Sequence, residues 1–207
     1  MRMTRSGWTS LFAVVGILAL SSLGLAAEFS ADFVSSGAGQ DSSGTLYVKG
    51  KGLFRREETQ GKRKIIVILN ADKKAVWLVN PAEKVYMTSP YQPQMVAMMT
   101  GVPSAKDSKL VKTEKVAGYM CEKRTLASKQ QGVSATVWVA KDLGITIKAE
   151  VTMGKQGTAH MDVKNIQQRT LSPALFLPPK GYKQVTQPTG AGGGGSGRGP
   201  VGRGRGR

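Results

Sequence analysis

His160 and Asp162 have the types and the spacing that acid–base chemistry could use. They lie two residues apart in the alternating stretch 159–163, so a strand would place both side chains on one face. A histidine–carboxylate pair can activate a nucleophile, but no glycine-framed nucleophile motif accompanies this one. A surface histidine on a strand accounts for the same pattern, and we expect a protein that is not an enzyme.

Cys121 is the only cysteine and His160 the only histidine among 207 residues. These counts exclude an internal disulfide framework and a Cys/His zinc cluster, and we expect neither a metal nor a cofactor. Cys121 lies in the alternating segment 119–126. We interpret it as a small buried apolar side chain, the alternative being a reactive thiol.

Residues 1–27 have the order of a secretory signal peptide. Arg2 and Arg5 precede the apolar run 11–20, and small residues follow as far as Ala27. The apolar run is shorter than the roughly 20 residues that cross a bilayer. We expect cleavage after Ala26 or Ala27 and export of the mature chain, the alternative being an uncleaved N-terminal anchor.

The net charge of +17, from 30 Lys and Arg against 13 Asp and Glu, comes mainly from lysines scattered along the chain. Scattered lysines keep strands soluble and edges unpaired; attraction to an acidic partner or an anionic membrane surface is the alternative. Residues 187–207 form a Gly/Arg-rich tail that we expect to be disordered. Arg-Gly tracts bind single-stranded nucleic acid, but this tract has no aromatic residue and follows an export signal, so nucleic acid is not favoured.

Residues 28–186 have the pattern of one mainly β domain that folds without the tail. Turn residues recur every 8–12 positions, which is typical of an antiparallel meander. The strands are expected at 29–34, 44–50, 53–58, 64–70, 74–80, 84–88, 110–116, 120–126, 134–140, 145–153 and 159–166.

One segment, 91–101, interrupts the strands and is predicted to be a short amphipathic helix ending at Gly101. Met95, Met98 and Met99 share one face of it at i, i+3 and i+4 spacing. They either pack in the core or form an adaptable apolar surface for a ligand or partner.

The strands at 65–69 and 75–79 are apolar on both faces, whereas a strand with one wet face alternates. A curved sheet explains this, with a loop or partner on its convex face and a helix or apolar ligand on its concave face. A simple sandwich core explains it too.

Several segments in order resemble the periplasmic lipoprotein-carrier superfamily (LolA/LolB-like), in particular its uncharacterised bacterial outer-membrane lipoprotein-sorting-like branch. They are 29–33, 44–49, 54–57, 77–81 and 84–86, then 116–123, 136–145 and 175–182. The resemblance covers about residues 28–186. It implies a periplasmic protein with a curved antiparallel sheet, or incomplete β-barrel, a short helical lid, and an apolar interior for acyl chains.

We therefore expect an exported envelope protein that binds an apolar ligand, a lipid or the acyl chains of a lipoprotein, and that could act as a carrier. The alternative is a sensory or scaffold domain that binds a partner protein without lipid transport. The pocket is expected beneath Met95–Met99, so that Met98→Asp would abolish binding of a fluorescent fatty acid. A one-residue error in strand parity would exchange the inner and outer faces. The candidate ligand-binding residues are Leu46, Val48, Phe54, Ile66, Ile68, Trp77, Val79, Met95, Met98, Met99 and Trp138.

Overall fold

The computed structural model describes residues 28–37, 41–128 and 132–186. The predicted signal peptide, 1–27, and the predicted tail, 187–207, lie outside these residues and stay predictions. The described elements are β1 (Glu28–Gly37), β2 (Ser42–Lys49), β3 (Leu53–Gln60), β4 (Arg63–Asn70), β5 (Ala75–Asn80), β6 (Val85–Pro90), α1 (Gln94–Thr100), β7 (Lys109–Val116), β8 (Tyr119–Ser128), β9 (Val133–Ala140), β10 (Ile145–Met153), the 3-10 turn η1 (Gly154–Gln156), β11 (Thr158–Gln168), the 3-10 turn η2 (Pro173–Phe176) and β12 (Lys183–Gln184).

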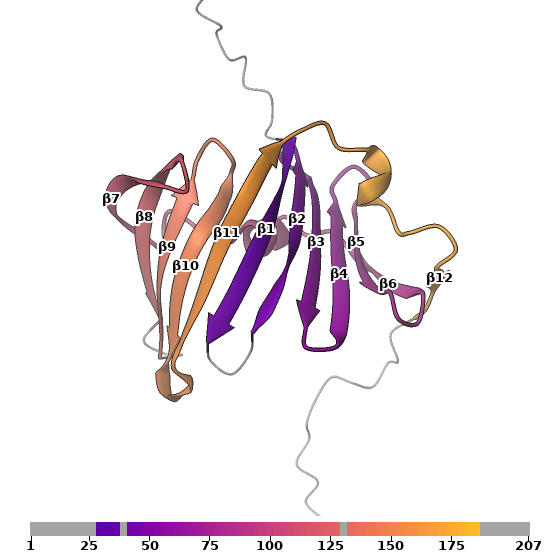
Figure 1. Cartoon of the computed structure of the whole chain (residues 1–207), viewed down its shortest axis with the longest axis horizontal. Coiled ribbons are helices and arrows are strands. Elements are labelled where there is room, and N and C mark those ends of the chain that lie inside the picture. Colours follow the sequence, from indigo (N-terminus) through magenta and orange to yellow (C-terminus); the bar gives the residue numbers. More distant parts are fainter. Residues whose placement is uncertain (1–27, 38–40, 129–131, 187–207) are drawn as a thin grey trace, which may run out of the picture.

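All twelve of these strands belong to one open sheet, in the order β12-β6-β5-β4-β3-β2-β1-β11-β10-β9-β8-β7. Two antiparallel meanders, β1–β6 and β7–β11, meet where β1 pairs with β11 at the centre (Figure 1). Only the two-residue β12 runs parallel to its neighbour. The predicted curved antiparallel sheet with a short helix is confirmed, and the sheet is not closed into a barrel.

The helix α1 crosses one face of the sheet because the two strands that it connects, β6 and β7, lie near opposite edges. It is seen behind β1 and β2 in Figure 1. Gly101 ends it in a left-handed conformation (φ 67°), with its N–H donating to the carbonyl of Ala97. The predicted helix is confirmed. It begins at Gln94, three residues after the predicted start. Within the described residues, no helix has the length and apolar character to cross a bilayer.

The face beneath α1 holds the larger apolar cluster, in which Phe29, Phe33 and Phe54 are buried. Gly44 lies beside Phe33 and permits this packing, because a Cβ there would clash with the carbonyl oxygen of Glu57. The guanidinium of Arg56 covers the Phe33 ring at 4.2 Å. Cys121 of β8 is fully buried, as expected, and burial raises the pKa of its thiol.

The opposite face of β3–β6 is covered by the chain after β11. Leu171 and Phe176 are buried against it, and η2 lies beside β3 and β4. Hydrogen bonds fix this cover: Arg55 Nη1 donates to the carbonyl of Leu175 at 3.0 Å, and the backbone N–H of Lys183 donates to the carbonyl of Lys84. The strands 65–69 and 75–79 are apolar on both faces because α1 and its core lie on one side and residues 171–182 on the other.

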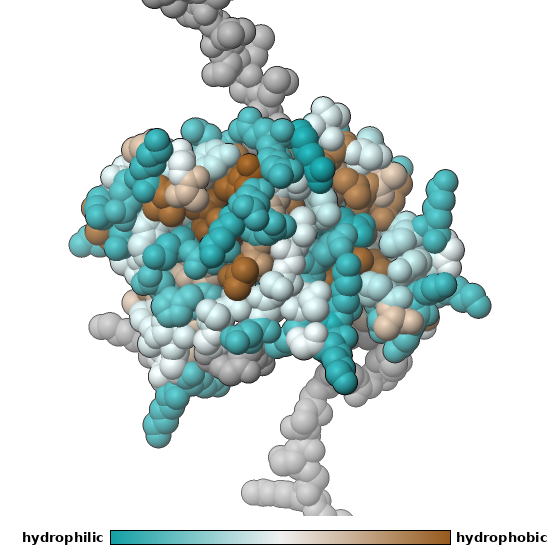
Figure 2. Space-filling model, viewed as in Figure 1, coloured by the Kyte–Doolittle hydropathy of each residue, from teal (hydrophilic) through white to brown (hydrophobic). Residues whose placement is uncertain are grey.

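Seen from the same side as in Figure 1, hydrophilic side chains are spread over the face opposite α1, with smaller apolar patches between them (Figure 2). Eight ion pairs join side chains in the described ranges, and most of them link residues two apart in a strand or neighbours across two strands. The pairs that involve exposed lysines contribute at most about 1 kcal/mol each. The lysines of the sheet therefore serve solubility more than stability.

Candidate ligand-binding cavity

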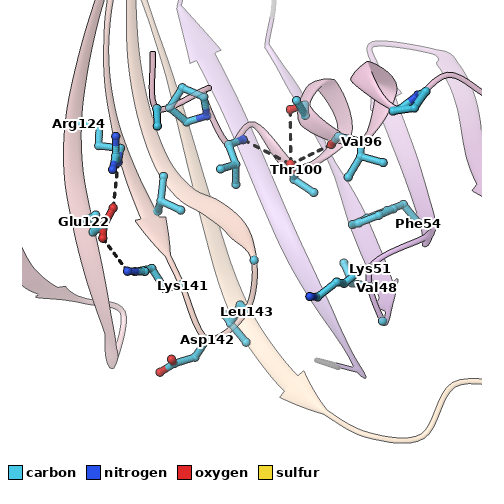
Figure 3. A pocket seen from close by; sticks show the side chains of 18 residues that line it. Val48, Lys51, Phe54, Val96, Thr100, Glu122, Arg124, Lys141, Asp142 and Leu143 are labelled. Carbon is cyan, nitrogen blue, oxygen red and sulfur yellow. Dashed lines mark hydrogen bonds and ion pairs between the residues drawn. The ribbon is translucent and has the colours of Figure 1, made fainter. Parts of the chain in front are cut away.

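A cavity of about 870 Å³ lies between α1, the following loop and the sheet. Its walls include β2 and β3 on one side and β8 and β9 on the other (Figure 3). In a flat sheet β3 and β8 would lie about 29 Å apart, at about 4.8 Å per strand. Since one cavity touches both, the sheet curls toward α1, and the face beneath the helix is the concave one.

The helix contributes one continuous stripe to the cavity. Pro93, Val96, Ala97 and Thr100 line it, at i, i+3, i+4 and i+7 spacing. The hydroxyl of Thr100 donates to the carbonyl of Val96 at 2.8 Å, which satisfies its polar atom within the helix. The helix therefore presents a mainly apolar surface to the cavity.

The sheet contributes apolar side chains from both meanders. Val48 and Phe54 are opposite each other in the β2–β3 ladder and so share a face. Val139 comes from β9 and Leu143 from the turn that follows it. All four are at most 5 % exposed, so the cavity wall they form is set by core packing.

A charged group occupies the side of the cavity formed by β8 and β9. Glu122 accepts hydrogen bonds from Arg124 Nε at 2.9 Å and from Lys141 Nζ at 3.0 Å. The hydrogen bond from Lys141, followed by that from Arg124, lowers the pKa of Glu122. Lys51 and Asp142 also line the cavity, from the turns after β2 and β9.

The lid over the cavity is fastened to the sheet on both sides of α1. Before the helix, the backbone N–H of Tyr91 donates to the carbonyl of Lys74 at 3.0 Å. After it, the hydroxyl of Thr146 in β10 donates to the carbonyl of Gly101 at 2.7 Å. Arg124 Nη1 donates to the hydroxyl of Ser108 at 2.9 Å and holds the end of the loop that leads to β7.

The predicted candidate residues separate into three groups. Val48 and Phe54 line the cavity. Leu46, Met95 and Met99 pack against the core beneath the helix without lining it. Met98 is 79 % exposed and does not line the cavity, which lies beside the face of α1 that carries Val96 and Ala97.

The remaining candidates lie away from the cavity. Ile66, Ile68, Trp77 and Val79 point to the outer face and pack against Leu171 and Phe176. These four side chains therefore lie on the face of β4 and β5 that does not hold the cavity. Trp138 alternates with Val139 and so points away as well.

Polar groups account for the position of Trp138. Its Nε1 donates to Glu114 at 2.7 Å. The amines of Lys123 and Lys148 lie over its ring at 4.8 and 4.7 Å.

Sequence reasoning missed most of the lining. For the helix, the i, i+3, i+4 rule that selected the methionines also fits Pro93, Val96 and Ala97. For the strands, Glu122 and Arg124 have strand alternation, but nothing in the sequence indicates which face is concave. His160 is exposed on β11, opposite Glu150 of β10.

The family described as "Domain of unknown function (DUF4412)" matches residues 35–150. No protein with a curated function matches the chain in sequence. Among solved structures, an uncharacterized conserved protein from Thermus thermophilus is 16% identical, over 79% of this chain and 93% of that one, with a TM-score of 0.59. At this identity the match shows a shared fold.

Two further solved structures match less well. A LolA superfamily protein from Nitrosomonas europaea is 12% identical over 73% of this chain and 90% of that one, with a TM-score of 0.39. A chain in the MucA/MucB complex of Pseudomonas aeruginosa is 14% identical over 74% of this chain and 56% of that one, with a TM-score of 0.47. The arrangement that the LolA-like resemblance implies, an open curved sheet with a short helix over its concave face, is the one found here.

Proposed function

This chain belongs to the family described as a domain of unknown function, DUF4412, and from the geometry of its cavity we propose that it binds the acyl part of a lipid or of an acylated protein in the bacterial periplasm. The periplasmic location rests on the signal peptide predicted at residues 1–27. The protein acts by binding and release, without a chemical step. Delivery between two membranes, the role of a carrier, is one use of such binding.

The cavity is the observation that carries this proposal. Its volume of about 870 Å³ falls in the range of roughly 300–1,000 Å³ typical of small-molecule sites. Val48, Phe54, Val96 and Leu143 offer it an apolar wall. Each methylene group moved from water to such a wall contributes about 0.8 kcal/mol, so an acyl chain supplies most of the binding free energy.

Release requires α1 and the loop after it to move, and few hydrogen bonds join them to the sheet. The lid consists of the seven-residue helix α1 and the loop that follows it, of which Val102, Pro103 and Ala105 also line the cavity. Opening on this side breaks the hydrogen bond between Thr146 and Gly101 and that between Arg124 and Ser108. The contacts of Met95 and Met99 with the core can stay intact on one side of α1 while the cavity opens on the other side.

Mass spectrometry of lipids extracted from the purified protein, isolated from its native envelope, tests the proposal. We expect stoichiometric lipid or acylated peptide with the wild type and little with Ala97→Trp, whose indole would fill the cavity. Met98→Trp is the matched control, because Met98 neighbours Ala97 but does not line the cavity. Equal lipid content in all three proteins, or none in the wild type, would contradict acyl binding in this cavity.

A second function, binding of a partner protein as a sensory or scaffold domain, is favoured by the edge strand β7. Its outward backbone groups are unpaired in the described chain, and Leu110 and Val111 are 48 % and 52 % exposed. Lys109, Lys112 and Lys115 follow the same edge. Lysines protect many edge strands, but exposed apolar side chains beside them favour an extended acidic segment of a partner, added as a further strand.

Proline substitution tests this second function. Val111 lies where the β7–β8 register shifts between Leu110 and Lys112, and proline there would fix the backbone of the edge and block addition of a strand. We expect it to abolish capture of acidic envelope proteins while the lipid content stays at the wild-type level. Capture that persists with Val111→Pro would contradict binding at β7.

A further inference from the structure

The wall of the cavity carries more positive than negative charge. Lys51, Arg124 and Lys141 line it, against Glu122 and Asp142. Such groups are costly beside an apolar space unless they are solvated or have a partner. Their arrangement therefore indicates which chemical group shares the cavity with the acyl chain.

Glu122 is already satisfied within the protein. It accepts hydrogen bonds from both Arg124 and Lys141, and these bonds lower its pKa, so it is ionised at neutral pH. One carboxylate between two cations leaves this group with a net positive charge. Lys141 is 70 % exposed in its side chain, whereas Arg124 is 19 % exposed, so the lysine is the cation that can turn to another anion.

Lys51 lies across the cavity from this group. Figure 3 shows Arg124, Glu122 and Lys141 on the β8–β9 side and Lys51 beside Val48, with its amine turned into the space between. In the described part of the chain Lys51 forms no ion pair. The Asp142 carboxylate, by contrast, points away from that space in the same view.

We infer that the ligand is an anionic amphiphile whose head group is held between Lys51 and Lys141 while its acyl chain lies against Val48, Phe54 and Val96. This inference rests on the proposed acyl binding and adds the chemistry of the head group. A carboxylate, as in a free fatty acid, and a phosphate, as in an anionic phospholipid, share this chemistry. Lys51 is exposed, so a neutral or cationic head group would leave its amine to water and gain no contact from it.

Three ligands with the same alkyl chain separate the possibilities in a displacement assay on the full chain: a fatty acid, an alkyl monophosphate and the methyl ester of the fatty acid. At neutral pH we expect both anions to bind about tenfold more tightly than the ester, as for one charge-assisted contact. High salt should reduce this difference, because it screens exposed charges. The tighter of the two anions identifies the source as fatty acid or phospholipid.

The double variant Lys51→Gln/Lys141→Gln tests the two residues. It should lose about tenfold in affinity for the anions and bind the ester as the wild type does; unchanged ester binding also shows that the variant is folded. Lys148→Gln is the matched control, because Lys148 lies over Trp138 and does not line the cavity. It should leave all affinities unchanged.

The outcomes separate this inference from the proposal beneath it. If the wild type binds the ester as tightly as the anions, or if Lys148→Gln weakens anion binding as much as the double variant, the head-group assignment is wrong and acyl binding stands. If the wild type binds none of the three ligands, the proposed acyl binding itself is wrong.

Discussion

The side-chain amide of Asn70 donates a hydrogen bond to the carbonyl oxygen of Phe176 at 3.0 Å. Asn70 ends β4 and is 5 % exposed, and its Oδ1 accepts from the backbone N–H of Lys73 at 2.9 Å. One side chain thus joins the β4–β5 turn to the segment that covers the outer face of the sheet.

Replacing Asn70 with Ala should lower the free energy of unfolding by about 2 kcal/mol, because a buried carbonyl loses its partner. Urea denaturation measures this. Asn80→Ala is the control: Asn80 also ends a strand, but its side chain bonds only the exposed N–H of Ala82, so we expect a change below about 0.5 kcal/mol. Equal effects of the two substitutions would mean that the bond to Phe176 does not hold the cover.

Substitutions at two adjacent helix positions distinguish the two sides of α1. Ala97 lines the cavity and Met98 does not. Ala97→Asp should weaken binding of a fluorescent fatty acid by more than about tenfold, since it places a carboxylate against the acyl chain. Met98→Asp should leave binding unchanged, in contrast to the expectation from the sequence. Loss of binding with Met98→Asp alone would place the ligand on the other side of the helix.

Replacing Thr146 with Val should loosen the lid. Thr146 is 2 % exposed and donates to the carbonyl of Gly101; valine keeps its shape and removes the hydrogen bond. A loss of about 1 kcal/mol would speed probe release about fivefold. Stopped-flow release and amide exchange over residues 95–101 measure this. Thr152→Val, which removes only the exposed bond to Thr158, should leave the release rate unchanged.

Acid should weaken the contact between β1 and the outer cover through Glu28. Its carboxylate accepts from Lys49 Nζ at 2.8 Å and from the backbone N–H of Leu171, and the hydrogen bond from Lys49 is the largest cause of its lowered pKa. A folded pKa below the usual 4.5 means that this stabilisation is present above about pH 4.5 and is lost as the pH falls through the folded pKa.

The Glu28→Gln variant isolates that contribution. Its Tm should fall less than that of the wild type between about pH 5 and about pH 3, because the variant has no carboxylate to protonate at this position. Thermal unfolding followed by circular dichroism at several pH values measures the difference. Parallel Tm curves for the two proteins would show that Glu28 contributes nothing to the pH dependence.

The strands and the helix could be predicted because alternation and turn residues are local signals. The apolar run 65–69 shows the limit of this reasoning. Both of its faces are covered, so the pattern does not show which residues point inward, and the predicted candidates Ile66 and Ile68 lie on the face away from the cavity. The deciding contact comes from Leu171 and Phe176, about a hundred residues later in the chain.

The site depends on a longer-range property still. Val48 and Val139 line one cavity only because the sheet curls, and curvature accumulates over many strands. Bulges contribute to it: the β9–β10 register shifts between Thr146 and Lys148. A short stretch of sequence does not indicate the curvature of the whole sheet. It does predict that Val48 and Phe54 share a face, because they are opposite each other in one hairpin.

The central ladder, where β1 pairs with β11, has a consequence for the order in which the chain folds. Phe33 lies opposite Val163, so β1 gains one of its two neighbours only after nearly the whole domain is available. Closing so long a loop is entropically costly and slow compared with forming the hairpins on either side. A chain emerging from a ribosome or a translocation channel would hold at most the β1–β6 meander and the β7–β10 hairpins, not yet joined, until residues 158–168 follow. The first segment of this chain resembles an export signal. The domain would therefore stay incompletely folded, and able to pass through an export channel, until translocation is almost complete.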